Sequence, residues 1–523
     1  MASYFIPLWF ATQVYYPPGP QVLTFYSSID DSDQPYALYL PRNIDLSRKW
    51  PLVISLHGEG SNHRLDLRRV LGRGNLPGQS NEEASRRFPL LPDVPFLVAS
   101  PLARGNMGYQ GIPEADVYEV LADVKRRFPV DEDRVYLTGL ASGGGGALWL
   151  ALTRPDVWAA VGAVCPIAPA GAEDLAANLL QLPLRLFQGS LDPLVAPSST
   201  RAWHKRLLDL GTPVEYFEYP AARHNAWDTA YRNAAIFDWF ARHRRNPMPD
   251  RVRFTTSRYR YRSAYWVDLD AFTPGTPAFI DARLTAPASV TIETRNLEGF
   301  TLKLASVPRV VTIDGVAVPP AALSFHREHN QWTAGRSSYA TGEKRPGAEG
   351  PIGEVFSERH LYVYGTQDSP AAQELERRRG EAQSLADWVS AGGRPYLQLR
   401  VAADRDLTQE DLYGSNLILL GNRRTNRFIA LWSDRFPLEL NPGAADYGLV
   451  YTFHVNGHNV VVSSGLAWWT SRAPPLSTLA DFLFFRGTAD NVIARGYFDR
   501  QWRLPLAARN AIRAAGAVVI RGE

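Results

Sequence analysis

The first 245 residues alternate short apolar runs with segments of helical periodicity, and this alternation is the feature that most constrains the fold. Short apolar runs bounded by turn residues are typical of buried strands, and i, i+3, i+4 spacing is typical of helices. The predicted strands are 21–25, 37–40, 51–56, 96–100, 134–138, 159–164, 184–188 and 214–219, and the predicted helices are 115–128, one that begins at 146, and 226–243. The first two strands are expected to form a hairpin. Strands that alternate with helices predict an α/β domain with a mostly parallel sheet covered on both faces.

The rest of the chain changes pattern twice. Residues 244–250 contain two prolines and no periodicity, so we predict a domain boundary there and a first domain over 1–245. From 251 to 320, short segments of period two that include Tyr259 and Tyr261 predict a small β domain. Residues 326–353 are polar and Gly-rich and are interpreted as a long loop. An α/β pattern then returns and predicts an accessory domain over 350–523.

The accessory domain offers several local signals. We predict strands at 360–364, 397–401 and 416–420, and a helix over 426–436. Ser369 followed by Pro370 predicts a helix start with serine as the N-cap, and Gly392 predicts its end. Asn456-Gly457 between two apolar segments predicts a tight hairpin. The strand ends at 362–365 and 417–421 are similar to turns of small nucleotide-binding folds, but no GxGxxG motif accompanies them.

Composition excludes several classes of function. Of 523 residues, 45% are hydrophobic and 21% are charged, and the net charge is only +3, which argues against a dedicated nucleic-acid binder. The single cysteine excludes an internal disulfide framework and a multi-cysteine metal site. The longest apolar runs are too short to span a membrane. Residues 1–13 are apolar but lack a basic start, so we expect them to pack against the protein and not to form a signal peptide.

Segments rich in glycine and polar residues follow several of the predicted strands. They are 56–60 (LHGEG), 139–146 (GLASGGGG), 189–195 (GSLDPLV) and 223–228 (RHNAWD). Glycines allow the backbone to approach a ligand closely. The glycine run lacks the Gly-Lys-Ser/Thr ending of a phosphate-binding loop, so close helix–strand packing is its expected role.

These segments carry a family resemblance. The region from about residue 27 to residue 243 resembles the α/β-hydrolase family, and within it the esterases of the feruloyl-esterase, polyhydroxybutyrate-depolymerase and dienelactone-hydrolase type. That family has the chain order nucleophile, acid, histidine. The glycine-flanked turn at 139–143, Asp192 and His224 follow this order. The resemblance implies an α/β-hydrolase fold, followed here by a C-terminal β and α/β accessory region, and a serine hydrolase that cleaves carboxylic esters through an acyl-enzyme.

The chain departs from the family pattern at its centre. The family's elbow is G-x-S-x-G, and with glycines at 139 and 143 the central residue is Ala141. Ser142 stands one position late, and it would place the bulky Leu140 where the elbow needs a small residue. We infer that serine has been replaced at 141, so that the chain as written binds substrate but barely turns it over. The retained partner residues favour a deliberate substitution over a decayed enzyme.

The resemblance assigns a role to each site residue. A serine at 141 would need a histidine, His224, to take its proton, and Asp192 would orient that histidine. The backbone N–H groups of Ser142 and of Gly58 or Glu59 would form the oxyanion hole. In the loop after strand 96–100, Met107 and Tyr109 lie at the carboxyl edge of the sheet, so we predict that they contact substrate.

The sequence therefore predicts a serine esterase that needs no cofactor and no metal. Its expected partner is a small-molecule or polymer-linked ester, with no nucleic acid and no membrane, and a homo-oligomer is left open. A cytoplasmic location is expected, with secretion left open if a leader was removed. Two alternatives remain: a prolyl-oligopeptidase-type serine peptidase, and a natural non-catalytic binding protein. Residues 251–523 are expected to play a structural or substrate-lid role.

Overall fold

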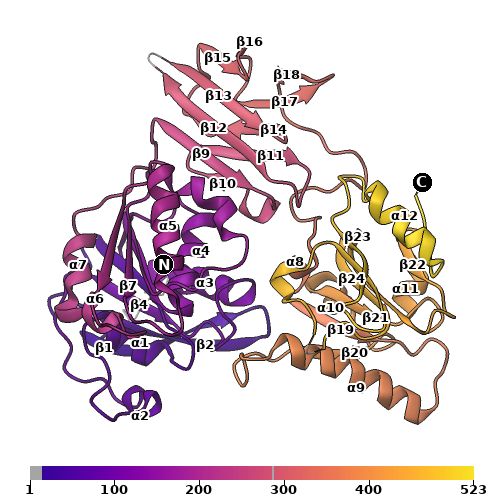
Figure 1. The fold of residues 1–523 in the computed structure, drawn as a ribbon, viewed down its shortest axis with the longest axis horizontal. Coiled ribbons are helices and arrows are strands. Elements are labelled where there is room, and N and C mark those ends of the chain that lie inside the picture. The colour runs from indigo at the N-terminus through magenta and orange to yellow at the C-terminus, as the bar shows by residue number, and fades with distance from the viewer. Residues whose placement is uncertain (1–14, 286–287, 471, 523) are drawn as a thin grey trace, which may run out of the picture.

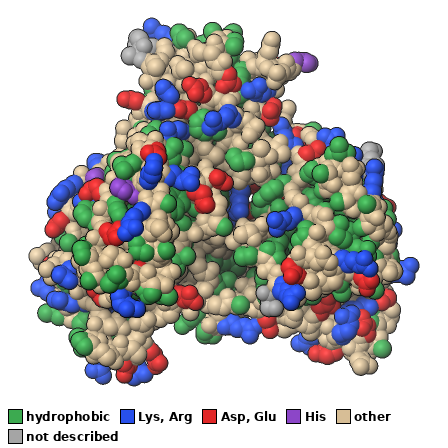
Figure 2. Space-filling model, in the orientation of Figure 1, with side chains coloured by type: hydrophobic (Ala, Val, Ile, Leu, Met, Phe, Trp, Pro, Cys, Tyr) green, Lys and Arg blue, Asp and Glu red, His purple; other side chains and the backbone are tan. Residues whose placement is uncertain are grey.

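The computed structural model describes residues 15–285, 288–470 and 472–522, and it forms three domains that follow one another along the chain (Figure 1). The expectation that residues 1–13 pack against the protein lies outside the described residues. Among the described residues, no helix is long and apolar enough to cross a membrane. On the visible face, cationic and anionic side chains are interspersed over all three domains, in keeping with the small net charge (Figure 2).

An eight-stranded sheet forms the centre of the first domain. Its strands are β1 (Gly19–Ser27), β2 (Ser32–Leu40), β3 (Trp50–Leu56), β4 (Leu97–Pro101), β5 (Val130–Leu140), β6 (Val161–Val164), β7 (Leu184–Gly189) and β8 (Val214–Tyr219). They lie in the order β1-β2-β4-β3-β5-β6-β7-β8. The predicted leading hairpin is confirmed, since β1 and β2 pair antiparallel. The strands from β4 to β8 pair in parallel, so their carboxyl ends share one edge.

Helices cover both faces of this sheet. They are α1 (His63–Val70), α2 (Asn81–Ser85), α3 (Ile112–Arg127), α4 (Ser142–Thr153), η1 (Ala172–Gln181), α5 (Pro197–Asp209), α6 (Trp227–Ala230), η2 (Arg232–Ala234) and α7 (Ala235–Phe240). The side chains alternate along each strand, and two buried clusters result, one with α3 and α4 and the other with α1 and α7. This arrangement is the predicted α/β-hydrolase fold.

The single closing helix predicted over 226–243 is wrong. The chain there is broken into α6, η2 and α7, because Asn233 and Ala234 have φ angles of 55° and 57°. Just before the break, the fully buried Tyr231 places its hydroxyl 2.7 Å from that of Thr138 in β5. Side-chain periodicity continues across the break, and for this reason the sequence pattern did not reveal it.

The second domain is a β-sandwich. Its elements are β9 (Arg251–Thr256), η3 (Tyr259–Tyr261), β10 (Ser263–Ala264), β11 (Val267–Phe272), β12 (Ala278–Thr285), β13 (Ser289–Arg295), β14 (Leu297–Leu302), β15 (Val310–Ile313), β16 (Val316–Val318), β17 (Ser324–Glu328) and β18 (Gln331–Ala334). Two five-stranded sheets, β10-β11-β14-β17-β18 and β16-β15-β13-β12-β9, pack around one buried cluster. The predicted β domain is present.

Two details of the β-domain prediction need correction. The domain does not end at 320, because the hairpin of β17 and β18, placed in a predicted loop, pairs with β14. Tyr259 and Tyr261 form a 3₁₀ turn, not a strand, because both side chains point into buried contacts. The Tyr259 hydroxyl donates to the Phe272 carbonyl at 2.9 Å. The Tyr261 hydroxyl donates to Glu114 of the first domain at 2.7 Å.

The third domain is again α/β. Its strands are β19 (His360–Tyr364), β20 (Arg400–Ala403), β21 (Asn416–Leu420), β22 (Leu438–Leu440), β23 (Tyr447–Val455), β24 (His458–Gly465), β25 (Phe482–Arg486), β26 (Val492–Gly496) and β27 (Val518–Ile520). Its helices are α8 (Ile352–Val355), α9 (Ala372–Val389), α10 (Gln409–Gly414), α11 (Arg427–Trp432), η4 (Leu476–Thr478) and α12 (Leu506–Ala515). Seven strands form one sheet in the order β20-β19-β21-β24-β23-β25-β26.

The local predictions for this domain fare unevenly. The Asn456-Gly457 hairpin is confirmed, with φ angles of 50° and 83° at the two turn residues. The predicted N-cap is wrong, because Ser369 lies in the left-handed region and α9 begins at Ala372 with Ala371 as its cap. That helix ends at Val389, before the predicted Gly392.

The first and third domains meet at a buried charged junction. Arg104 is fully buried, with ion pairs of 2.7 Å to both Asp30 and Asp116. It also donates to the carbonyl of Tyr396 in the third domain at 3.0 Å. The nearby Gln398 N–H donates to Asp30 at 3.1 Å, so this segment contacts the first domain. For this reason β20 begins at Arg400, three residues later than predicted.

Candidate active site

The turn between β5 and α4 places residue 141 in a strained backbone conformation. Ala141 has φ 52° and ψ −117°, which is rare for a residue with a side chain. Its N–H donates to the Val164 carbonyl at 2.9 Å, and its carbonyl accepts from the Ile167 N–H at 3.2 Å. Ser142 begins α4 and has no positive φ angle. The sharp residue of the turn is therefore 141, and not the serine that follows.

Close backbone contacts account for the glycine run around this turn. A Cβ on Gly139 would lie 2.2 Å from the Gly143 carbonyl oxygen, and one on Gly143 would lie 2.2 Å from the Leu56 carbonyl oxygen. A Cβ on Gly146 would meet the Tyr109 ring at 2.5 Å. These distances are too short for any side chain, so the glycines let α4 start directly above the ends of β3 and β5.

Asp192 and His224 lie together beyond the ends of β7 and β8. The His224 Nδ1 atom is 2.9 Å from Asp192 Oδ2, and the Asp192 side chain is fully buried while the His224 side chain is 19% exposed. The other carboxylate oxygen accepts from the N–H groups of Leu194 and Val195, both at 2.9 Å. Burial would raise the pKa of Asp192, but these N–H groups and His224 outweigh it and hold that pKa below its usual value. The carboxylate is thus charged and aimed at the imidazole.

Cys165 stands beside this pair. Among the described residues, one ligand atom each from Cys165, Asp192 and His224 lie within 4.8 Å of one another, so these three side chains could hold a metal ion. Burial and the neighbouring Asp192 raise the pKa of the thiol to about 12. The sulfur is therefore a neutral thiol at neutral pH, and thiolate is the form that binds metals. The hydrogen bond between Asp192 and His224 therefore explains the close approach of these side chains better than a metal site does.

The segment 57–60 lies directly against the elbow. A Cβ on Gly58 would be 3.3 Å from the Cβ of Ala141, so the predicted oxyanion loop and position 141 are in contact. Gly58 is buried and Glu59 is exposed. The buried His57 ring holds the loop, with its two nitrogens each 2.9 Å from a carbonyl oxygen, those of Gly58 and Leu102.

The two residues predicted to contact substrate lie elsewhere. Tyr109 is only 5% exposed, and its hydroxyl donates to the His57 carbonyl at 2.8 Å, so it packs behind the predicted oxyanion loop. Met107 lines a separate cavity of about 290 Å³ between the three domains. A Cβ on Gly393 of the third domain would lie 2.3 Å from the Met107 sulfur. The substrate contacts of Met107 and Tyr109 stay predictions, and the contact that the structure shows for the Tyr109 hydroxyl is the one to His57.

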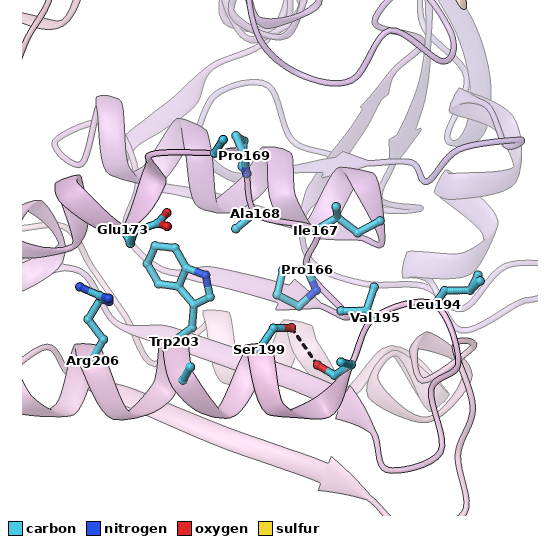
Figure 3. A pocket seen from close by; sticks show the side chains of 13 residues that line it. Pro166, Ile167, Ala168, Pro169, Glu173, Leu194, Val195, Ser199, Trp203 and Arg206 are labelled. Carbon is cyan, nitrogen blue, oxygen red and sulfur yellow. Dashed lines mark hydrogen bonds between the residues drawn. The ribbon is translucent and has the colours of Figure 1, made fainter. Parts of the chain in front are cut away.

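A larger cavity, of about 470 Å³, opens between α5 and the loops that follow β6 and β7 (Figure 3). Its walls are Pro166, Ile167, Ala168, Pro169, Ala170, Glu173, Leu194, Val195, Ala196, Ser199, Ala202, Trp203 and Arg206. The Trp203 ring projects from α5 toward the loop after β6, with Glu173 and Arg206 at the same end (Figure 3). Two wall residues connect the cavity to the site: Ile167 binds the Ala141 carbonyl, and Val195 binds Asp192.

Sequence reasoning missed two aromatic residues of this region. Trp227 is half-buried and packs edge-on against the His224 ring, with 5.4 Å between the ring centres. The Arg69 guanidinium lies 5.2 Å from the centre of the Trp227 ring. Trp203 was not singled out. The available signal was position, because both residues follow the carboxyl ends of parallel strands, where α/β proteins bind ligands.

Comparisons with known proteins agree with the geometry. Residues 114–233, which include the elbow, Asp192 and His224, match the family Esterase, described as "Putative esterase". This match supports a hydrolase of ester substrates in general. No curated protein matches the chain.

Several solved structures are similar to part of the chain. A thermostable esterase is 22% identical with a TM-score of 0.35, over 43% of this chain and 63% of its own. A ferulic acid esterase is 18% identical with a TM-score of 0.35, over 44% of this chain and 99% of its own. Dipeptidyl peptidase 4 of Porphyromonas gingivalis is 18% identical with a TM-score of 0.32, over 44% of this chain and 36% of its own. The chain thus spans less than two thirds of the thermostable esterase, and at these low TM-scores none of the three assigns an activity here.

Proposed function

We propose that the site of the first domain is that of a serine-type carboxylic ester hydrolase with position 141 as the nucleophile position. The strand order of the sheet and the match of residues 114–233 to the family Esterase support this proposal. The strained φ of 52° at Ala141 is the observation that carries the proposal. A sharp, strained strand-to-helix turn is what presents a nucleophile above a sheet. A packed alanine has no local need for it.

The chemistry follows from the groups around position 141. With serine there, His224 would take the hydroxyl proton as the oxygen attacks the ester carbonyl, and the imidazolium would be stabilised by Asp192. The tetrahedral oxyanion would accept from the N–H groups of Ser142 and of Gly58 or Glu59. His224 would then protonate the leaving alcohol, and a water activated by the same imidazole would release the acid. With Ala141 the attack has no nucleophile, so the chain binds the ester and leaves it intact.

The cavity beside the site indicates the kind of ester. Proline, alanine and valine walls suit a hydrocarbon group, and the Trp203 ring offers a flat apolar face. Glu173 and Arg206 at the Trp203 end supply both an acceptor and a donor for a polar substituent. We expect an aromatic or acyl ester, either a small molecule or a group attached to a polymer.

Parallel assays of the Ala141→Ser protein test the substrate class. Feruloyl and short acyl esters should be hydrolysed with kcat/KM well above that for peptide anilides of similar size. The reverse preference would overturn the esterase proposal in favour of a prolyl-oligopeptidase-type peptidase. The Ala141→Gly protein is the matched control, because it changes the same position without adding a nucleophile.

The alanine itself favours one alternative, a non-catalytic protein that captures esters without cleaving them. Its retained Asp192–His224 hydrogen bond of 2.9 Å would then serve only the shape of the site. The codon for position 141 in the natural gene discriminates between the two, because serine there would end this alternative. Alanine there, together with tight binding of an intact ester, would support it.

A further inference from the structure

The third domain contains its own topological switch point, which the proposed esterase chemistry does not use. In its sheet, β19 lies between β20 and β21, and all three strands are parallel. The chain leaves β19 for α9, whose Leu385 packs in the cluster on one face. It leaves β21 for α11, whose Phe428 packs in the cluster on the other. Where neighbouring connections diverge in this way, a crevice opens beyond the strand ends, and open α/β sheets bind ligands there.

Buried polar side chains fix the loops at this point. Asp404, 1% exposed, accepts from the Thr366 N–H at 3.0 Å after β19 and from the Arg427 N–H at 2.8 Å after β21. Asn426, fully buried, donates to the carbonyls of Val363 and Leu420 at the ends of the same strands, both at 3.1 Å. The two loops are therefore held in one arrangement before any ligand arrives, which lowers the cost of binding.

A cavity of about 220 Å³ occupies this crevice. Its lining comes from the ends of β19, β21 and β24 and from α9: Tyr364, Gly365, Glu374, Arg377, Arg378, Glu381, Leu420, Gly421, Asn422, Thr425, Ser463 and Gly465. A Cβ on Gly365 would lie 2.1 Å from the Thr425 carbonyl oxygen, so the base of the cavity is bare backbone. Ligand sites for drug-sized molecules are about 300–1,000 Å³, so this cavity suits something smaller.

The charges around the cavity are already paired. Arg377 binds Glu374 at 2.8 Å and Glu381 at 3.0 Å. Arg378 binds Glu374 at 2.9 Å and Asp368 at 2.7 Å. An anionic or cationic ligand would have to break one of these pairs and face the like charge left behind. A hydroxyl group can instead accept from a free guanidinium N–H and donate to a free carboxylate lone pair without disturbing them.

We propose that this cavity binds a neutral polyhydroxylated ligand of about one sugar ring. Carboxylates, guanidinium groups, the Ser463 hydroxyl and the Asn422 amide belong to the lining and supply both donors and acceptors. The Tyr364 ring and the hydrocarbon stem of Arg378 supply apolar surface for the C–H face of such a ring. The third domain is then a sugar-binding module attached to the hydrolase domain.

The test is saturation-transfer NMR and calorimetry on the full chain. The probes are glucose, galactose, xylose, arabinose and mannose, with inorganic phosphate, adenosine monophosphate and glycine as charged competitors of similar size. We expect at least one sugar to bind with a Kd of about 10 mM or tighter, and the charged probes not to bind. No sugar binding, or binding of a charged probe alone, would overturn the proposal.

Two charge-removing variants of one helix place the site. Glu381 lines the cavity and is 30% exposed, whereas Glu376 lies on the exposed face of α9 and is not part of the lining. Glu381→Ala should weaken sugar binding about tenfold or more, and Glu376→Ala should leave it unchanged. Arg377→Ala repeats the test from the donor side, and thermal unfolding verifies that each variant folds. Equal affinities in all variants would place the sugar elsewhere and refute this site. Ester hydrolysis is not measured, so the outcome is independent of the proposed function.

Discussion

The first and third domains are both α/β sheets with a candidate site at the carboxyl edge, but the two candidate sites are built differently. The elbow of the first domain depends on one strained residue, Ala141, and on glycines that no side chain could replace. The cavity of the third domain depends on paired charges from α9 and on buried polar residues, such as Asp404, that connect its loops by hydrogen bonds. Covalent chemistry needs one atom in one place, whereas binding distributes its contacts.

This difference explains why the sites leave different traces in the sequence. The elbow imposes glycine at 139 and 143, a spacing that is readable without any structure. The lining of the third-domain cavity is drawn from residues about a hundred positions apart, from Tyr364 to Gly465, with no fixed spacing. The comparison predicts that a single substitution can abolish or restore the function of the first site, but only weaken that of the second.

The largest expected effect is a gain of activity in Ala141→Ser. Loss of the serine from a comparable triad costs on the order of 10⁶ in kcat, so its return should raise p-nitrophenyl acetate hydrolysis by several orders of magnitude. Steady-state kinetics of the two proteins measure this gain. The double variant Ala141→Ser/His224→Ala should lose it. An unchanged rate in Ala141→Ser would show that the elbow is not a nucleophile site.

The next effect concerns Asp192 in the Ala141→Ser background. Asp192→Asn keeps the shape of the side chain but removes the charge that the 2.9 Å contact to His224 requires. In a comparable triad this change lowers kcat about 10⁴-fold, because the imidazole is held in the wrong tautomer. Stopped assays over a long incubation measure the remaining rate. A loss below about tenfold would mean that Asp192 only shapes the turn, as a structural role would predict.

The sequence predicted most of the first domain because its signals are local. Each predicted strand from 51–56 to 214–219 overlaps an observed one. Most of these strands are buried and therefore appear as short apolar runs, and the edge strand β8 appears as an alternation of exposed and partly buried residues. The break at Asn233 could not be predicted because it depends on a tertiary contact. The spacing of apolar residues does not indicate whether a φ angle is positive or negative. The hydrogen bond of Tyr109 to the His57 carbonyl could not be predicted for a similar reason: its position after a strand indicates the edge of the sheet, but not the direction of its side chain.

The third domain shows where sequence reasoning ends. The Asn456-Gly457 turn was predicted because positive φ angles restrict the residue types. The start of α9 was not, because Ser369 and Pro370 satisfy the capping rule while the backbone at Ser369 turns left-handed. Of its candidate cavity, the sequence indicated only the strand ends at 362–365 and 417–421, which are similar to turns of small nucleotide-binding folds. Nothing in a linear pattern states that α9 closes over them.

A third prediction tests the junction that holds the two regions together. Arg104→Ala would leave the buried Asp30 and Asp116 without their partner, and breaking such a pair costs about 3–5 kcal/mol. Burial already raises the pKa of Asp116 to about 6, even with Arg104 beside it. Without the guanidinium this pKa rises further, so the native state of the variant holds a protonated Asp116 at pH 5. The loss of stability should therefore be smaller at pH 5 than at pH 8.

Thermal unfolding of Arg104→Ala at the two pH values measures this dependence. Arg86→Ala is the matched control, because Arg86 and its partner Glu82 are 66% and 81% exposed, and such surface pairs contribute about 0–1 kcal/mol. Equal shifts in the two variants would show that the junction is held by packing alone.

The smallest expected effect separates two roles for Tyr109. Tyr109→Phe in the Ala141→Ser background removes only the hydroxyl that donates to the His57 carbonyl at 2.8 Å, and the ring against Gly146 remains. The lost hydrogen bond contributes about 0.5–1.5 kcal/mol to holding the oxyanion loop, so kcat should fall a few-fold with KM unchanged. Tyr118→Phe is the control, since the buried Tyr118 hydroxyl has no hydrogen-bond partner among the described residues. A rise in KM at constant kcat would instead return Tyr109 to the substrate contact that its place in the sequence predicts, because lost uniform binding leaves the chemical step untouched.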